Sequence, residues 1–175
     1  MARRGFETIA GSRRGTVWLV VVSLALTSAA HAEDLVGKRV PPFPGGFSEG
    51  GGTCIVIGSK DPCARGVSIM LNSAGEGVAV FAWAADGHDE QRKPFKLVSD
   101  VLSHPKLSKG YHMEWSHCRL DGAADDAVVA VVRDAKRTWL RASAWAYRLE
   151  SSSGKFVKLE PKRVDCYNPA IDAAD

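Results

Sequence analysis

The alternation of apolar and polar residues along this chain predicts a β-rich protein. Short runs of β-branched, aliphatic or aromatic residues recur between clusters of Gly, Asn, Asp and Ser, which is the pattern of strands joined by turns. The predicted strands cover residues 55–57, 67–71, 78–84, 111–120, 128–132, 138–150, 155–159 and 163–165. This spacing favours a mainly β fold, organised as a single small antiparallel domain over residues 54–167.

Residues 93–103 show a different pattern. Pro94 suits the first turn of a helix, and His104-Pro105 would end one. The apolar positions that follow helical spacing are Phe95, Val98, Val101 and Leu102. This segment therefore predicts one short helix, which would make the fold α+β.

An internal similarity argues for a strand at the same place. Residues 81–84 with 93–97 resemble residues 143–146 with 154–159, at an offset of about 62 residues. If the chain holds two copies of one β unit, the segment after Pro94 is a strand. The sequence leaves this choice open.

Both ends of the chain differ from the predicted domain. Four arginines, an apolar run at 17–26 and the triplet Ala30-His31-Ala32 make residues 1–32 a cleavable signal peptide. The apolar run is too short for a spanning helix, which needs roughly 20 residues. Residues 33–53 hold three prolines and six glycines, which predicts a flexible lead-in, and 168–175 is predicted to be a frayed tail.

Cleavage would change the net charge. The signal peptide carries four of the 23 Lys and Arg and one of the 20 Asp and Glu, so 19 of each remain. The basic character of the whole chain therefore belongs to the targeting segment and gives no support for a nucleic-acid partner. The mature protein is expected to be periplasmic or secreted, with no transmembrane anchor after cleavage.

The four cysteines lie in the predicted mature part. An even number in an oxidising compartment favours two disulfides over free thiols or a metal site, and the spacing contains no close zinc-type pair. Three pairings are possible. We prefer Cys54 with Cys63, because Gly58 and Asp61-Pro62 supply a turn between them, which leaves Cys118 with Cys166.

Two predicted strands divide small from aromatic residues. In 78–84 and in 139–149, alternate positions put Ala and Val on one face and bulky residues on the other. The bulky face suggests either a binding surface or a second core face. The candidate binding residues, which include neighbouring basic positions, are Arg137, Trp139, Arg141, Trp145, Tyr147 and Lys158.

Charge is concentrated in one segment. The strands predicted at 138–150 and 155–159 are expected to pair as a hairpin across the turn at 151–154. Residues 133–163, which contain this hairpin, hold nine Lys and Arg against three Asp and Glu, which favours an anionic partner there. The alternative is a solvated face that protects an edge strand from pairing.

Candidate catalytic residues are few. His112 and Glu114 lie two apart on one strand face, and a pocket that added Asp121 would favour acid–base chemistry. Ser48 lies in a G-x-S-x-G match without the strand and helix that a nucleophile elbow needs. The sequence therefore predicts no catalytic residue, cofactor or metal.

The function that these patterns favour is non-catalytic binding of an anionic envelope component, either a polymer or a protein. An inhibitor or immunity-type protein that binds an enzyme is the alternative, and a hydrolase is the third hypothesis. The ligand and the partner stay unknown at this level.

Overall fold

The computed structural model describes residues 32–56 and 63–171. The predicted signal peptide lies outside this part of the chain except for its last residue, and so does the end of the predicted tail. Within the described residues, no helix is long and apolar enough to cross a membrane.

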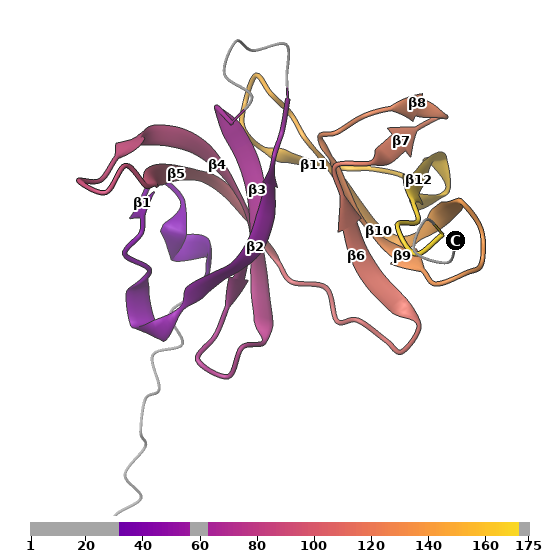
Figure 1. Ribbon diagram of the computed structural model, residues 1–175, viewed down its shortest axis with the longest axis horizontal. Coiled ribbons are helices and arrows are strands. Elements are labelled where there is room, and N and C mark those ends of the chain that lie inside the picture. Colours follow the sequence, from indigo (N-terminus) through magenta and orange to yellow (C-terminus); the bar gives the residue numbers. More distant parts are fainter. Residues whose placement is uncertain (1–31, 57–62, 172–175) are drawn as a thin grey trace, which may run out of the picture.

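Two antiparallel sheets lie side by side (Figure 1). The first has the order β1-β5-β4-β3-β2, and the second has β6-β9-β10-β12-β7-β8, with β11 paired to β10. The first sheet comprises β1 (Arg39–Val40), β2 (Ser48–Cys54), β3 (Arg65–Leu71), β4 (Gly77–His88) and β5 (Pro94–Ser103). The second comprises β6 (Tyr111–Trp115), β7 (Cys118–Leu120), β8 (Ala123–Ala124), β9 (Val128–Arg133), β10 (Trp139–Leu149), β11 (Phe156–Lys158) and β12 (Val164–Tyr167).

The mainly β prediction is confirmed, and the helix predicted at 93–103 is wrong. The only helical elements in the described residues are the short 3-10 turns η1 (Ala32–Leu35), η2 (Pro44–Gly46) and η3 (Pro161–Arg163). Residues Pro94–Ser103 form β5, whose backbone pairs with β4 on one side and β1 on the other. Ala82 pairs with Asp100 and Trp83 with Val98, so β5 has one extra residue at this point, which interrupts the two-residue alternation of its apolar positions. The apolar spacing therefore resembles that of a helix, although pairing with the neighbouring strands makes the segment a strand.

Residues 33–53 differ from the predicted flexible lead-in. They carry β1 and most of β2, and Leu35 and Val40 are buried. The glycines let β2 lie close to β3: a Cβ at Gly52 would overlap the Ser68 hydroxyl and the Val67 carbonyl oxygen. Glycine here allows an edge strand to pack closely against its neighbour. Composition alone does not distinguish this role from that of glycine in a flexible segment.

Three apolar clusters fill the molecule. The cluster between the sheets includes Val67, Val80 and Ala82 from the first sheet and Val129 and Leu149 from the second. A second cluster covers the other face of the first sheet, where the N-terminal segment supplies buried side chains. The third lies on the opposite face of the second sheet, which curls so that β7, β9, β10 and β12 contribute to one interior.

The two sheets repeat one strand arrangement. The orders β2-β3-β4-β5 and β6-β9-β10-β11 correspond. Residue pairs of β2–β3 and of β4–β5 recur 62 positions further along the chain in β6–β9 and in β10–β11. Thr53 faces Val67 in the first sheet, and Trp115 faces Val129 in the second. The pairing of β4 with β5 is likewise repeated in that of β10 with β11. The similarity noted in the sequence therefore corresponds to two structurally alike β units.

The second unit departs from the first in β10. A register irregularity between Ala142 and Ala146 shifts its pairing with β9. Beyond that point Trp145 and Tyr147 pack around the core between the sheets. Before it, Trp139 and Arg141 pair with β12 and reach the surface. The irregularity thus separates the part of β10 that contacts the inter-sheet core from the part that pairs with β12.

Both preferred disulfides are present, Cys54–Cys63 and Cys118–Cys166. The second joins β7 to β12 within the interior of the curled sheet, where both cysteines are buried. Two disulfides and no free cysteine in the described residues indicate an oxidising, extracytoplasmic environment.

The longer disulfide should stabilise the fold more. Its cysteines are 48 residues apart, against 9 for the other pair. On the chain-entropy model, the double substitution Cys118→Ala/Cys166→Ala should lower the free energy of unfolding by about 4 kcal/mol, and Cys54→Ala/Cys63→Ala by about 3 kcal/mol. Urea denaturation would measure both values, and a larger loss from the second variant would contradict this ranking.

Gly52→Ala tests whether β2 is a packed strand. The added methyl group must displace Ser68 or the β3 backbone, so the free energy of unfolding should fall by about 1–3 kcal/mol. Ser48→Ala, at the exposed start of the same strand, should change it by less than about 0.5 kcal/mol. Equal, negligible effects of both substitutions in thermal or urea unfolding would mean that this segment is not held in the sheet.

Candidate functional site

The connection between β9 and β10 forms the wall of a cationic cavity. This cavity has a volume of about 440 Å³. Its lining residues are Arg133, Asp134, Ala135, Arg137 and Arg141. Arg133 ends β9, Arg137 lies in the connection and Arg141 lies in β10, so all three arginines that line the cavity belong to one hairpin. We call this the arginine cavity.

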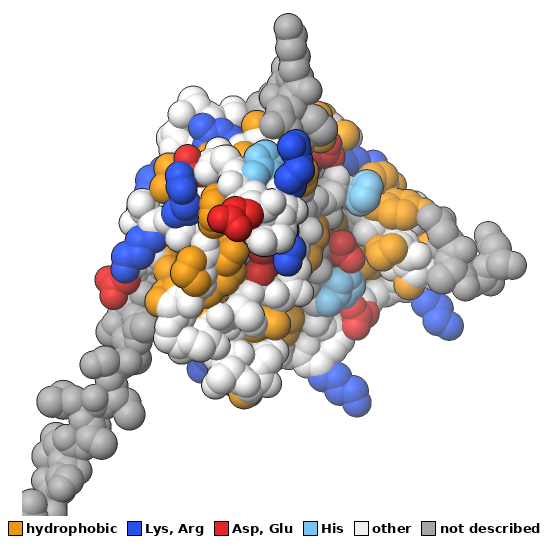
Figure 2. All heavy atoms as spheres, turned by 60° about the vertical axis from the view of Figure 1, so that its left-hand side comes forward, with side chains coloured by type: hydrophobic (Ala, Val, Ile, Leu, Met, Phe, Trp, Pro, Cys, Tyr) orange, Lys and Arg blue, Asp and Glu red, His pale blue; other side chains and the backbone are white. Residues whose placement is uncertain are grey.

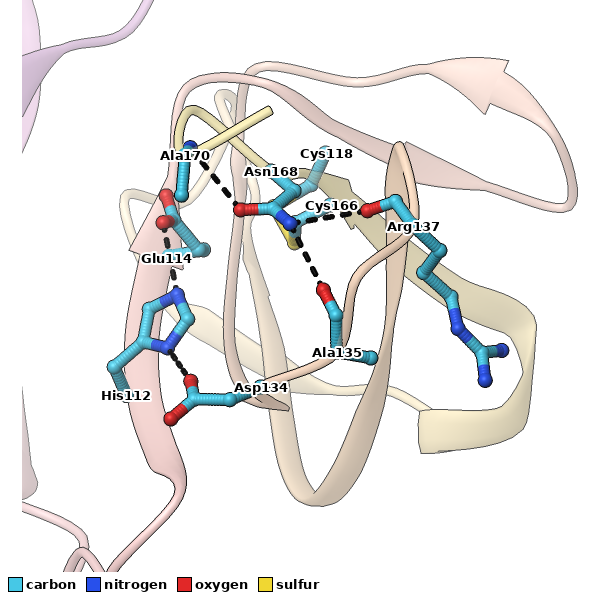
Figure 3. A network of polar contacts seen from close by, with 9 residues as sticks. All are labelled: His112, Glu114, Cys118, Asp134, Ala135, Arg137, Cys166, Asn168 and Ala170. Atoms are coloured by element: carbon cyan, nitrogen blue, oxygen red, sulfur yellow. Dashed lines mark hydrogen bonds and ion pairs between the residues drawn. A yellow bond between two sulfur atoms is a disulfide. The ribbon is translucent and has the colours of Figure 1, made fainter. Parts of the chain in front are cut away.

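Asn168 holds the connection in place. Its side-chain Nδ2 donates hydrogen bonds to the carbonyl oxygens of Ala135 and Arg137, each at 3.0 Å, and its Oδ1 accepts one from the Ala170 N–H. Its backbone N–H donates to the Thr138 carbonyl oxygen. Asn168 is only 7% exposed. The predicted tail therefore begins with a buried side chain that orders the arginine cavity (Figure 3).

His112 fixes the side chain of Asp134. The imidazole Nδ1 lies 2.6 Å from Asp134 Oδ1, and Nε2 lies 3.1 Å from Glu114 Oε1. Figure 3 shows the ring between the two carboxylates, while the Arg137 side chain extends away from this network. His112 thus orients the one acidic side chain that lines the arginine cavity.

A second cavity lies on the other side of Asp134 and Ala135. Its volume is about 590 Å³, and buried Leu140 forms part of its lining together with His112 and Glu114. It opens beside the interior of the curled sheet, because His112 and Glu114 pair with Val132 and Ala130, two members of the cluster there.

The three cavity arginines have no ion pair within the described residues, whereas four other arginines do. The paired ones are Arg39 with Asp86, Arg119 with Asp165, Arg148 with Asp125, and Arg163 with Asp121. On the face shown in Figure 2, cationic and anionic side chains are likewise interspersed. The arginine cavity therefore holds three arginines and one carboxylate, and in the described residues that carboxylate is paired with His112 rather than with an arginine.

Trp139 lies beside Arg119. The Arg119 Cζ is 3.4 Å from the centroid of the Trp139 ring, and the ring meets Tyr167 edge-on with centroids 5.7 Å apart. Arg119 donates to both carboxylate oxygens of Asp165, each at 2.7 Å. These hydrogen bonds raise the pKa of the Arg119 guanidinium above its ordinary value, so Arg119 stays charged under all ordinary conditions.

The structure gathers only part of the set that the sequence suggested. Arg137 and Arg141 line the arginine cavity, whereas Trp139, two residues before Arg141 in β10, lines a different cavity. Trp145 and Tyr147 pack at the core between the sheets. The remaining candidate, Lys158, is exposed in β11 and lines neither the arginine cavity nor the cavity beside it.

Sequence reasoning missed two residues of the site. Arg133 belongs to the basic segment but is not among the candidate binding residues, although it ends the strand that precedes the connection carrying Arg137. Asn168 falls in the predicted tail. The Asn-Pro pair that follows the last strand is a turn signal, but nothing local shows that its amide reaches residues 31 and 33 positions earlier.

The structure does not bring together the three residues on which the acid–base hypothesis depends. His112 and Glu114 meet Asp134, whereas Asp121 is bound by Arg163, and this hydrogen bonding lowers the pKa of the Asp121 carboxyl. In the part of the chain that the structure describes, no group of three or more His, Cys, Asp or Glu is arranged to hold a metal ion. The contacts of His112 instead hold the Asp134 carboxylate at the edge of the arginine cavity.

Comparisons of the chain with protein-family models, with curated proteins and with solved structures find no match.

Asn168→Asp should loosen the site. The new carboxylate would face the Ala135 and Arg137 carbonyl oxygens and lose both donors, which should lower the free energy of unfolding by about 2–3 kcal/mol. Gln91→Glu makes the same chemical change at an exposed position and should be nearly neutral. Equal urea midpoints for the two variants would show that Asn168 does not hold the connection.

Proposed function

We propose that this protein is a non-catalytic binding protein that takes an anionic group of a cell-envelope component into the arginine cavity. One observation carries the proposal: Arg133, Arg137 and Arg141 line a single cavity, and none has an ion-pair partner in the described part of the chain. A guanidinium presents a planar fork of N–H donors that matches the oxygens of a carboxylate or a phosphate. Three such forks around one cavity suit an anion better than any neutral ligand.

The surroundings of the cavity support binding by a preformed site. Asn168 holds the backbone between two of the arginines, so less conformational entropy is lost when an anion binds. His112 draws Asp134 Oδ1 to its own side of the connection, which leaves the guanidinium groups available for a ligand.

The compartment supports an envelope ligand. The disulfides fit an oxidising, extracytoplasmic environment, and the N-terminal pattern of the sequence suggests export to a periplasm or beyond the cell. Envelope polymers in that space carry phosphates and carboxylates, which are the groups that the arginine cavity suits.

The direct test replaces Arg133, Arg137 and Arg141 together with Gln. Because each lost charge-assisted hydrogen bond is worth about 1.5–3 kcal/mol, retention on isolated envelope material of the native host at low salt should weaken at least tenfold. A sedimentation assay with the purified protein would measure this.

The matched control removes the same charge elsewhere. Lys38, Lys93 and Lys106 are exposed and belong to the first β unit or to the segment after it, so their replacement with Gln should change retention by less than about twofold. Equal weakening of both triple variants would mean that net charge alone explains the retention. Full retention of the arginine variant would reject the proposed site. Recovery of one protein at a fixed ratio, released by the arginine variant, would favour the inhibitor-type alternative.

A further inference from the structure

An aromatic cavity lies next to the arginine cavity on the second sheet. Its volume is about 350 Å³, and its lining includes Trp139, Tyr167, Arg119, His117 and Asp126. Trp139 and Tyr167 are both partly exposed. The proposed anion site does not include this aromatic cavity, and the packing of the sheets does not fill it.

Strand pairing places both cavities on one face. Arg141 of β10 lies opposite Asp165 of β12, which lies opposite Arg119 of β7. In the neighbouring row, Trp139 lies opposite Tyr167. Trp139 and Arg141 are two positions apart on one strand, so they share a face and lie roughly 7 Å apart. A single extended ligand can therefore contact both cavities.

The aromatic cavity is held rigidly. Arg119 is fixed by two hydrogen bonds to Asp165 and stacks on Trp139, and Trp139 contacts Tyr167 edge-on. The disulfide Cys118–Cys166 lies on the opposite face of the same strands and joins β7 to β12. The rings are therefore in place before any ligand arrives.

The two cavities differ in charge. The arginine cavity holds three unpaired guanidinium groups, whereas the charge of Arg119 is balanced by Asp165, and Asp126 adds a carboxylate to the aromatic lining. An acidic group is therefore favoured in the arginine cavity and disfavoured in the aromatic cavity. The aromatic cavity instead suits an uncharged ligand ring with polar edges, because Trp139 and Tyr167 offer apolar area and His117 and Asp126 offer hydrogen-bonding groups.

We infer that the ligand is an acidic polysaccharide, with its acid group in the arginine cavity and a neighbouring sugar ring on Trp139 and Tyr167. This inference rests on the proposed function and names its ligand class. A sugar ring has an apolar C–H face that packs on an aromatic ring, and hydroxyl groups at its edge that bond to His117 and Asp126. An acidic peptide instead brings repeated carboxylates toward Asp126, which repels them.

Calorimetric titration with three probes at low salt tests the inference. The probes are alginate oligosaccharide as an acidic polysaccharide, poly-L-glutamate as an acidic peptide and dextran as a neutral polysaccharide. The full mature protein should bind alginate most tightly and dextran most weakly. Trp139→Ala should weaken alginate binding at least about fivefold while leaving poly-L-glutamate binding unchanged.

A second variant avoids truncating a packed side chain. Ala124 lies in the exposed strand β8 and lines the aromatic cavity, so Ala124→Gln should fill that space and also weaken alginate binding at least about fivefold. Ala123→Gln makes the same change at the adjacent exposed position outside the lining and should bind alginate like the unaltered protein.

The outcomes separate this inference from the proposed function. If the triple arginine variant loses both acidic polymers while Trp139→Ala and Ala124→Gln bind alginate normally, the sugar subsite is overturned and the anion site stands. Poly-L-glutamate binding as tightly as alginate would also overturn it, in favour of an acidic protein surface. If the triple arginine variant binds every probe normally, both proposals fail.

Discussion

The contact between the two sheets determines how the rest of the chain must fold. Val67 and Val129, equivalent residues of the two β units, both lie in the cluster between the sheets. Burying one face of each sheet leaves the other face apolar and in need of cover. The N-terminal segment supplies that cover for the first sheet, and the second sheet curls over its own interior, which Cys118–Cys166 crosses.

The candidate site lies where the second unit departs from the first. On one side of the irregularity in β10, Trp145 and Tyr147 contact the inter-sheet core. On the other side, Trp139 and Arg141 lie beside β12, a strand that the first unit lacks at the equivalent place. The same strand continues into Asn168, whose amide fixes the β9–β10 connection. One addition to a repeated β framework therefore orders the arginine cavity and the aromatic cavity.

Local sequence patterns predicted the mainly β class and the Cys54–Cys63 pairing, because both depend on residues close in sequence, and Cys118–Cys166 followed as the remaining pair. They failed at β5, where pairing on both sides overrides helical spacing, and at Gly52, where absence of a side chain permits packing rather than motion. Asn168 shows the limit most clearly. Its role depends on carbonyl groups that only the folded chain brings near, so no pattern around it could predict the contact.

The most direct measurement follows the arginine side-chain Nε–Hε signals by nuclear magnetic resonance while inorganic phosphate is added at low ionic strength. We predict that the signals of Arg133, Arg137 and Arg141 shift together and saturate, whereas those of Arg39 and Arg148, which are bound to aspartates, stay in place. Equal shifts of paired and unpaired arginines, or no saturable shift at all, would contradict the account.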